Sequence, residues 1–134
     1  MIATAWLGVG SADMARRAAA ELLAGPNAPT AFFTAQNDIT VGVLQHLHDL
    51  DDGRDIGLVG FDDFPPADLL GITVIAQDVA EIGRTAASLL FDRIDGDRSP
   101  ARRRTLPVQF LDRGSASGTR GLSRPSGSRP ATGS

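Results

Sequence analysis

Short apolar segments alternate with segments of helical periodicity along most of this 134-residue chain, and no other feature restricts its fold as strongly. Four runs are typical of buried strands because they are short, apolar and bounded by proline, glycine or polar residues. They are residues 30–35, 56–61, 72–76 and 105–111. Apolar residues recur at helical spacing in three other segments, which are 13–24, 39–50 and 79–94. Strands that alternate with helices predict an α/β fold with a parallel sheet covered on both faces.

The helix predicted at 79–94 has the clearest boundaries. Asp78 followed by Glu81 resembles a capping box at its start, and Gly96 suits its end. We expect its apolar residues to face inward; they are Val79, Ile82, Ala86, Leu89, Leu90 and Ile94. In the helix predicted at 13–24, the expected core positions are Met14, Ala15, Ala18, Ala19, Leu22 and Leu23.

Composition excludes several classes of site. The sequence has no cysteine and no lysine, which excludes disulfide bonds, thiolate metal sites, cysteine nucleophiles, and the lysine of a P-loop or Schiff base. The only histidines, His46 and His48, are two residues apart on a predicted helix, so they face different sides and do not share a metal ion. No nucleophile–base pair is readable and no run of eighteen apolar residues occurs. We therefore expect no catalytic residue, metal, cofactor or membrane-spanning helix.

Charge divides the chain into two parts. Residues 1–98 carry six arginines and fifteen acidic residues, whereas residues 99–134 carry seven arginines and one acidic residue. The acidic part argues against nucleic-acid binding by the body of the protein, and the arginine-rich end is interpreted as a solvated tail in preference to a polyanion contact. Gly, Ser, Pro, Thr and Arg dominate residues 114–134, which predicts disorder. We expect residues 12–113 to fold as one partial domain, preceded by an edge segment at 1–11 that lacks a positive leader.

Polar residues follow two of the predicted strands. Gln36, Asn37 and Asp38 come after the first, and Asp62 and Asp63 come after the second. Parallel strands place their carboxyl ends on one edge of a sheet, where ligands bind in such folds. The absence of lysine disfavours a magnesium site of the phospho-acceptor type, and two adjacent carboxylates that point apart disfavour glycoside hydrolysis.

Hydrogen bonding to sugar or nucleoside hydroxyls remains as the favoured chemistry for this edge, since carboxylates and amides suit it. An equally weighted alternative is that Asp62 or Asp63 caps the turn before Pro65. Asn37 is expected to be the N-cap of the following helix. Gln36 is harder to explain as a cap.

Four blocks of sequence resemble, in order, the carboxyl half of the LacI/GalR family of transcriptional regulators. They are PTAFFTAQNDITVGVLQHLHDL, IGLVGFDDFPPADLL, ITVIAQDVAEIGRTAASLLFDRIDG and LPVQFLDRGS. The resemblance covers residues 29–115 and extends weakly back to residue 12. It is specific because the VGFDD block, the strand that ends in Gln77, the E-x-G-R-x-A-A helix and the terminal D-R-G-S occur together.

The resemblance implies part of a sensor of the type I periplasmic-binding-protein kind, a three-layer α/β/α arrangement that is incomplete here and mainly one lobe. It implies a sugar or similar small polar metabolite as effector, with contacts from Asp62, Gln36 and Asn37. It also implies that the helix at 79–94 crosses into an absent lobe. An open apolar face on that helix would favour marginal stability or association.

By the same resemblance, two segments form the surface that pairs sensors into a homodimer. The expected interface residues are Val41, Leu44, Pro66, Leu69 and Leu70. The alternative for Val41 and Leu44 is packing on their own sheet. DNA would be bound only through an amino-terminal helix-turn-helix that this chain lacks. We therefore expect a fragment of a cytoplasmic regulator, the alternative being a periplasmic sugar-binding protein of an ABC uptake system.

Overall fold

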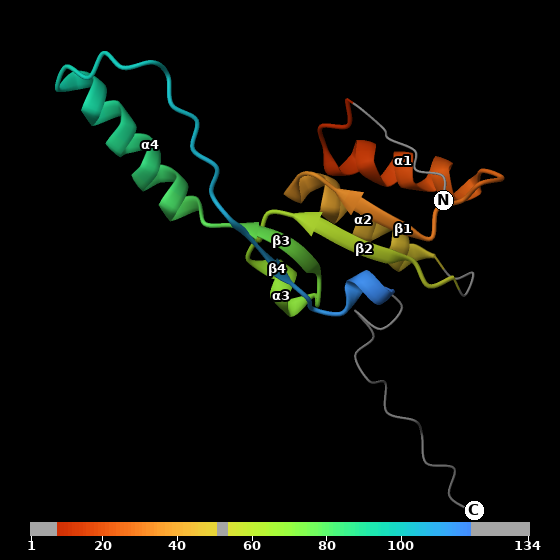
Figure 1. The fold of residues 1–134 in the computed structure, drawn as a ribbon. Coiled ribbons are helices and arrows are strands. Elements are labelled where there is room, and N and C mark those ends of the chain that lie inside the picture. Colours follow the sequence, from red (N-terminus) through yellow and green to blue (C-terminus); the bar gives the residue numbers. More distant parts are fainter. Residues whose placement is uncertain (1–7, 51–53, 119–134) are drawn as a thin grey trace, which may run out of the picture.

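The sheet of the protein has four strands in the order β1-β2-β3-β4 (Figure 1). The structure is a computed structural model that describes residues 8–50 and 54–118. Its strands are β1 (Ala31–Thr34), β2 (Gly57–Phe61), β3 (Thr73–Gln77) and β4 (Val108–Leu111). Strands β1, β2 and β3 are parallel, as predicted, and the α/β class is confirmed.

Strand β4 corrects one expectation, because it runs antiparallel to β3. The chain leaves the sheet at the carboxyl end of β3, passes through a helix, and enters β4 at that same edge, where Gln77 pairs with Val108. A strand that re-enters from the edge at which its neighbour ended can only pair in the antiparallel direction. The sheet is therefore mixed.

Two helices build the core with the sheet. These are α1 (Ala12–Ala24) and α2 (Asn37–Asp49), and they pack against each other while α2 covers one face of β1 and β2. Gly42 makes their close approach possible, since a Cβ at this position would lie 2.0 Å from the carbonyl oxygen of Ala12. The buried core joins helices and strands through Ala15, Ala19, Leu23, Val43, Leu47, Ile56, Leu58, Phe64, Ala67, Ile72 and Val74. Met14, expected in this core, is 48% exposed because the buried stripe of α1 consists of small residues and Leu23 on the side facing α2.

The opposite face of the sheet is open over most of its area in the described part of the chain, and only the segment at 115–118, which lies against Gly57, covers one end of it. Phe33 and Phe110 lie on that face by the strand register, and both are exposed. Helices therefore cover one face only, and the prediction of a sheet covered on both faces is wrong for the described chain.

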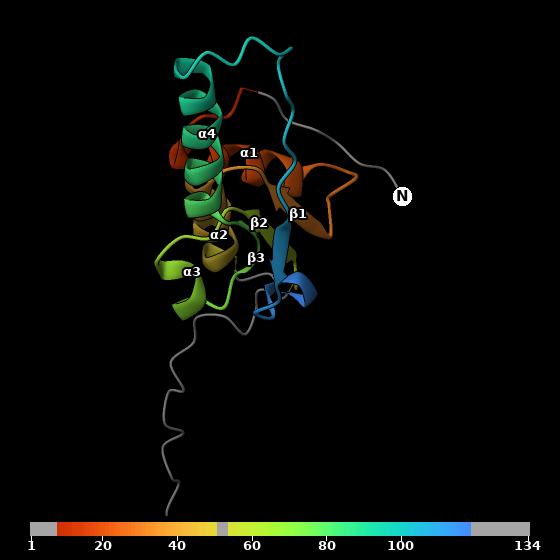
Figure 2. The same cartoon turned by 60° about the vertical axis from the view of Figure 1, so that its left-hand side comes forward.

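Helix α4 (Val79–Ile94) has the predicted bounds, and Asp78 Oδ1 accepts from the N–H of Glu81 at 2.8 Å, as a cap should. The capping box is half formed, because the Glu81 carboxylate pairs with Arg84 instead of returning to the start of the helix. None of its residues is buried, so the expectation that its apolar side chains face inward is wrong for the described chain; Val79 is 74% and Ile94 67% exposed. Figure 1 shows α4 standing away from the sheet, and in the turned view of Figure 2 the segment after it runs back along the helix to β4.

Two short helices complete the described elements. Helix α3 (Pro66–Leu69) connects β2 to β3, and the 3-10 helix η1 (Ser115–Ser117) follows β4. The ordered, buried Ser115 lies just past Arg113, so the fold extends slightly beyond the predicted limit. Most of the predicted edge segment and tail, residues 1–7 and 119–134, lies outside the described residues. Across residues 8–50 and 54–118, no helix is both long and apolar enough to cross a membrane.

Candidate functional site at the carboxyl edge of the sheet

The strand register brings the three predicted effector-binding residues to one edge of the sheet. Thr34 of β1 pairs with Gly60 of β2, which pairs with Val74 of β3, so these strands end almost level. The polar residues Gln36, Asn37 and Asp62 follow the ends of β1 and β2, and Gln77 ends β3. We call these four residues the carboxyl-edge cluster.

Asp62 is the centre of this cluster. Its backbone is in the left-handed region (φ 73°), which aspartate tolerates better than most residues, and its N–H donates to the carbonyl of Ile75 at 2.9 Å. Its carboxylate accepts a hydrogen bond from the side-chain amide of Gln77. The turn is capped instead by Asp63, whose Oδ1 accepts from the N–H of Phe64 at 3.1 Å. An ionised carboxylate has about four acceptor sites, so Asp62 keeps acceptors for a ligand.

The structure moves the predicted helix cap by one residue. Gln36 occupies the N-cap position of α2 without a side-chain cap bond, and Asn37 is the first helical residue. The backbone carbonyl of Gln36 accepts from the N–H of Thr40 at 2.9 Å, which fixes this start. Asn37 Oδ1 is buried and lacks a partner among the described residues. A donor brought by a ligand or water would satisfy it.

A buried threonine pair supports this edge, and the sequence did not single it out. The hydroxyls of Thr34 and Thr40 lie 2.7 Å apart, and Thr40 Oγ1 also donates to the carbonyl of Gln36 at 3.1 Å. Gly60 leaves room for this pair, because a Cβ there would lie 3.0 Å from Thr40 Oγ1. The hydrogen bonds of this threonine pair therefore fix the strand-to-helix connection that contains Gln36 and Asn37.

A cavity of ≈ 550 Å³ lies beside Gln77, where the two connections between the sheet and α4 meet. Its lining combines amides, carboxylates and apolar side chains: Gln77, Asp78, Val79, Glu81, Leu106, Pro107 and Gln109. Gln77 thus faces both Asp62 and this cavity. Its place at a strand end before a helix cap was the available sequence signal, although sequence reasoning assigned it no role at the site.

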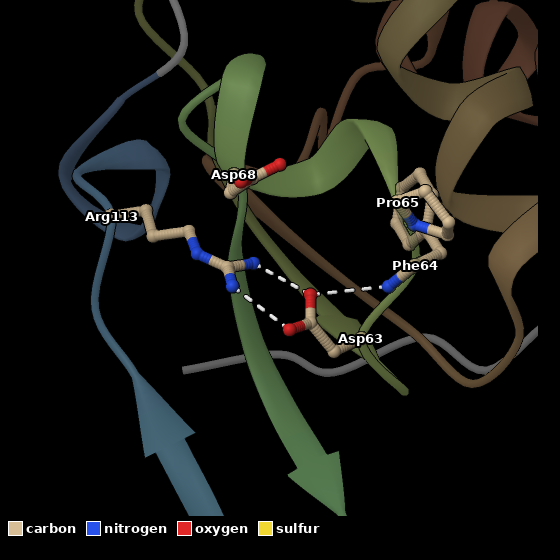
Figure 3. Close-up of a pocket in the computed structure, with 5 residues that line it drawn as sticks. All are labelled: Asp63, Phe64, Pro65, Asp68 and Arg113. Carbon is tan, nitrogen blue, oxygen red and sulfur yellow. Dashed lines mark hydrogen bonds and ion pairs between the residues drawn. The ribbon is translucent and has the colours of Figure 1, made fainter.

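A second, smaller pocket of ≈ 240 Å³ lies between α3 and the end of β4 (Figure 3). Arg113 and Asp63 face each other in it through two parallel contacts, Nη1 to Oδ1 at 2.7 Å and Nη2 to Oδ2 at 2.9 Å. The hydrogen bond from Arg113 lowers the pKa of Asp63, and the same contact raises the pKa of Arg113. Each charge already has its partner, so this pair connects two loops. We therefore consider the carboxyl edge, and not this pocket, as the ligand site.

The D-R-G-S segment extends that tie into the core. Ser115 Oγ donates to the carbonyl of Leu58 at 2.6 Å and accepts from the N–H of Thr73 at 2.8 Å. Asp112 Oδ1 accepts from Thr73 Oγ1 at 3.1 Å and from the N–H of Gly114 at 3.0 Å. These bonds fasten the end of β4 to β2 and β3.

The predicted interface residues divide into two groups. Leu69 is 87% exposed and Pro66 is exposed, so both are available for an interface. Val41, Leu44 and Leu70 are half-buried and pack against the core, in keeping with the alternative stated for Val41 and Leu44. Within the described residues, no three histidine, cysteine or acidic side chains gather in a way that could hold a metal ion.

Comparison with known proteins agrees with this architecture. Residues 3–116 match the family of periplasmic binding protein-like domains. The HTH-type transcriptional regulator PtxS of Pseudomonas aeruginosa is 43% identical over 95 residues, which is 68% of this chain and 28% of that protein. The ribose operon repressor of Escherichia coli K12 is 34% identical over 100 residues, which is 72% of this chain and 30% of the repressor.

Among solved structures, a LacI family transcriptional regulator from Enterococcus faecium with bound ribose superposes with a TM-score of 0.67. It is 28% identical, and the match covers 79% of this chain and 40% of that one. The chain therefore spans about a third of the length of the curated relatives that it matches.

Proposed function

Because the chain belongs to the periplasmic binding protein-like domains, within the LacI-type branch, we propose that it is the carboxyl part of the effector-binding domain of a transcriptional regulator. Its role would be to bind a small polar metabolite, of the sugar class, at the carboxyl edge of the sheet. DNA would be bound by a separate amino-terminal headpiece, in the cytoplasm, under the control of this domain.

The observation that carries the proposal is the position of Asp62. Its carboxylate is fixed by Gln77 and by its own backbone bond to Ile75, yet it lies at a sheet edge and not in the core. Asn37 adds a buried acceptor without a partner at the same edge. Acceptors held in place without competing cations suit the hydroxyl groups of a sugar. The Enterococcus relative, which contains ribose, supports the ligand class.

Two other functions are less well supported. An uptake protein would share the fold, but the relatives described above are regulators. An enzyme would need a nucleophile and a base in contact, and the polar contacts of the carboxyl edge are an amide on a carboxylate and a pair of hydroxyls. Regulators of this kind are not enzymes, and this chain fits that role.

Dimerisation is the second part of the proposal. Leu69 and Pro66 present exposed apolar surface on and beside α3, as a two-fold interface requires. Val41, Leu44 and Leu70 would border this surface from their half-buried positions.

The test is a ¹⁵N NMR titration of the chain with D-ribose first, then with other pentoses, hexoses and nucleosides. One wall of a cleft should bind a sugar weakly, in the millimolar range, and shift the amides near Gln36, Asp62 and Gln77. Asp62→Ala should abolish those shifts, whereas Asp13→Ala on the exposed side of α1 should leave them unchanged.

In a regulator that carries both lobes, Asp62→Ala should weaken effector binding by roughly tenfold to a few hundredfold, since charge-assisted hydrogen bonds are the strong ones. If Asp62→Ala instead lowers stability by about 1 kcal/mol with affinity unchanged, the carboxylate serves only to hold the end of β3 through its hydrogen bond with Gln77. Micromolar sugar binding by this chain alone would contradict the proposal that the chain supplies only one wall of the binding cleft.

A further inference from the structure

The far end of α4 carries an arginine-rich segment that the proposed function does not use. Four of the seven residues 98–104 are arginine: Arg98, Arg102, Arg103 and Arg104. All four are exposed, and the segment contains no aromatic residue and no large apolar one. Because the chain has no lysine, every cation here is a guanidinium, the group that binds phosphate through two parallel bonds.

Hydrogen bonds and ion pairs tie the segment to the end of helix α4. Arg93 Nη1 donates to the carbonyls of Asp97 at 2.9 Å and Ser99 at 2.5 Å. The N–H of Ser99 donates to Asp97 Oδ1 at 2.8 Å. Arg102 Nη2 lies 2.9 Å from Asp92 and 2.6 Å from Asp97, so its charge is neutralised and it acts as an anchor.

The remaining arginines carry charge without a carboxylate partner. In the part of the chain that the structure describes, Arg103 and Arg104 make no ion pair, and they follow the anchored Arg102 directly. Residues 92–104 hold five arginines against three aspartates, whereas the rest of the described chain is acidic.

Distance separates this positive end from the acidic sheet. Helix α4 has 16 residues, which at 1.5 Å per residue spans about 24 Å. Charges further apart than a Debye length, about 8 Å at physiological salt, are largely screened from each other. Figure 1 shows the turn after α4 at the point of the described chain that stands furthest from the sheet.

We propose that residues 98–104 form a contact surface for the phosphate backbone of nucleic acid. A surface of exposed guanidinium groups without apolar side chains recognises charge and spacing, not base sequence. A regular array of phosphates fits it better than an acidic peptide, since the peptide must be ordered on binding. This contact is independent of a helix-turn-helix headpiece and of any effector, so it goes beyond the function proposed above.

The experiment is a ¹⁵N NMR titration of the full 134-residue chain with a 12-base-pair DNA duplex, with no sugar present. At 50 mM salt the amides of residues 98–104 should shift, and the shifts should disappear at 300 mM salt because counterion release drives the binding. Removing two phosphate contacts in Arg103→Gln/Arg104→Gln should weaken binding at least fivefold and lower the slope of log K against log salt by about 1.8. The matched control is Arg17→Gln/Arg84→Gln, which removes the same charge from exposed ion pairs elsewhere and should change affinity less than twofold.

Four results would overturn the proposal. The first is the absence of shifts at 50 mM salt, and the second is an equal loss of affinity in the control variant, which would indicate net charge alone. The third is a set of shifts confined to residues 119–134, where Arg120, Arg124 and Arg129 lie in the sequence. The fourth is tighter binding of poly-L-glutamate with an equal number of charges, which would assign the surface to acidic polypeptides. Since no sugar is used, failure here is distinct from failure of the effector proposal.

Discussion

Arg113 and Asp63, fifty residues apart in sequence, are joined by two parallel contacts of 2.7 and 2.9 Å that tie the end of β4 to the loop after β2. The partners come from the loop that leaves the carboxyl edge and from the segment that closes the described fold. The tie thus holds the turn of Asp63 in place next to Asp62.

Acid should lower the free energy of unfolding by protonating Asp63 in this pair. The pKa of Asp63 is lowered in the folded state by the hydrogen bond from Arg113, so its contribution is complete above the unfolded pKa, about 3.9, and is lost as pH falls through the folded value. The pair is partly exposed, so we expect about 1 kcal/mol after solvent screening. Urea unfolding from pH 6 to pH 2 should show a smaller acid loss in Asp63→Asn than in the wild type. Equal losses would remove the pair from the acid response.

Ser115→Ala should destabilise the fold strongly for the loss of a single hydroxyl. Ser115 is 0% exposed, and its removal leaves the carbonyl of Leu58 and the N–H of Thr73 without this partner. A buried unsatisfied group costs about 1–3 kcal/mol. Chemical denaturation measures the difference, and Ser117→Ala, which removes an exposed hydroxyl from the same short helix, should change stability by less than about 0.5 kcal/mol. Equal effects would contradict the assigned network.

Gly42→Ala should separate α1 from α2. The added Cβ would meet the carbonyl oxygen of Ala12 at 2.0 Å and the Cβ of Ala15 at 2.8 Å, both within well-packed helices. Overpacking of this kind typically costs about 1–3 kcal/mol. Gly83→Ala on α4, where a Cβ meets nothing within 4 Å, should be neutral or stabilising by up to about 1 kcal/mol because alanine favours the helix. In thermal melting, Gly42→Ala should lower the melting temperature and Gly83→Ala should not, if the helix contact is as described.

Self-association should depend on two separate surfaces. Leu69 on α3 and Leu90 on α4 are both exposed, and a charge placed in an apolar contact disrupts it. In sedimentation velocity, the wild type should form species larger than dimers, because two different surfaces permit chain growth. Leu69→Glu and Leu90→Glu should each leave dimers, and the double variant should be monomeric. Leu69 is the better choice than Leu70, whose half-buried side chain would also affect the core.

Local signals in the sequence predicted the elements well. The periodicity and the Asp78 cap gave the bounds of α4, and the polar residues after β1 and β2 were placed at the correct edge. Predictions that depend on the exact residue were less accurate. At the start of α2, the N-cap is Gln36 and not the predicted Asn37. The direction of β4 was also missed, because periodicity identifies a strand without giving its orientation.

Long-range pairs were beyond sequence reasoning. The bonds of Ser115 to Leu58 and of Arg113 to Asp63 join residues that are 57 and 50 positions apart, and no local pattern marks such partners. The D-R-G-S segment was recognised only by resemblance, while its physical role is visible in the hydrogen bonds of the fold.

The isolation of α4 divides the chain into regions of unequal local stability. A helix of 16 residues without a buried side chain draws no support from tertiary packing, and peptides of that length are only marginally helical in water. Its amide protons should therefore exchange with deuterium through local opening, long before those of β2, where Leu58 is fully buried. The sheet with α1 and α2 would behave as one cooperative unit, and α4 as a fraying appendage that gains order only when something covers its apolar side.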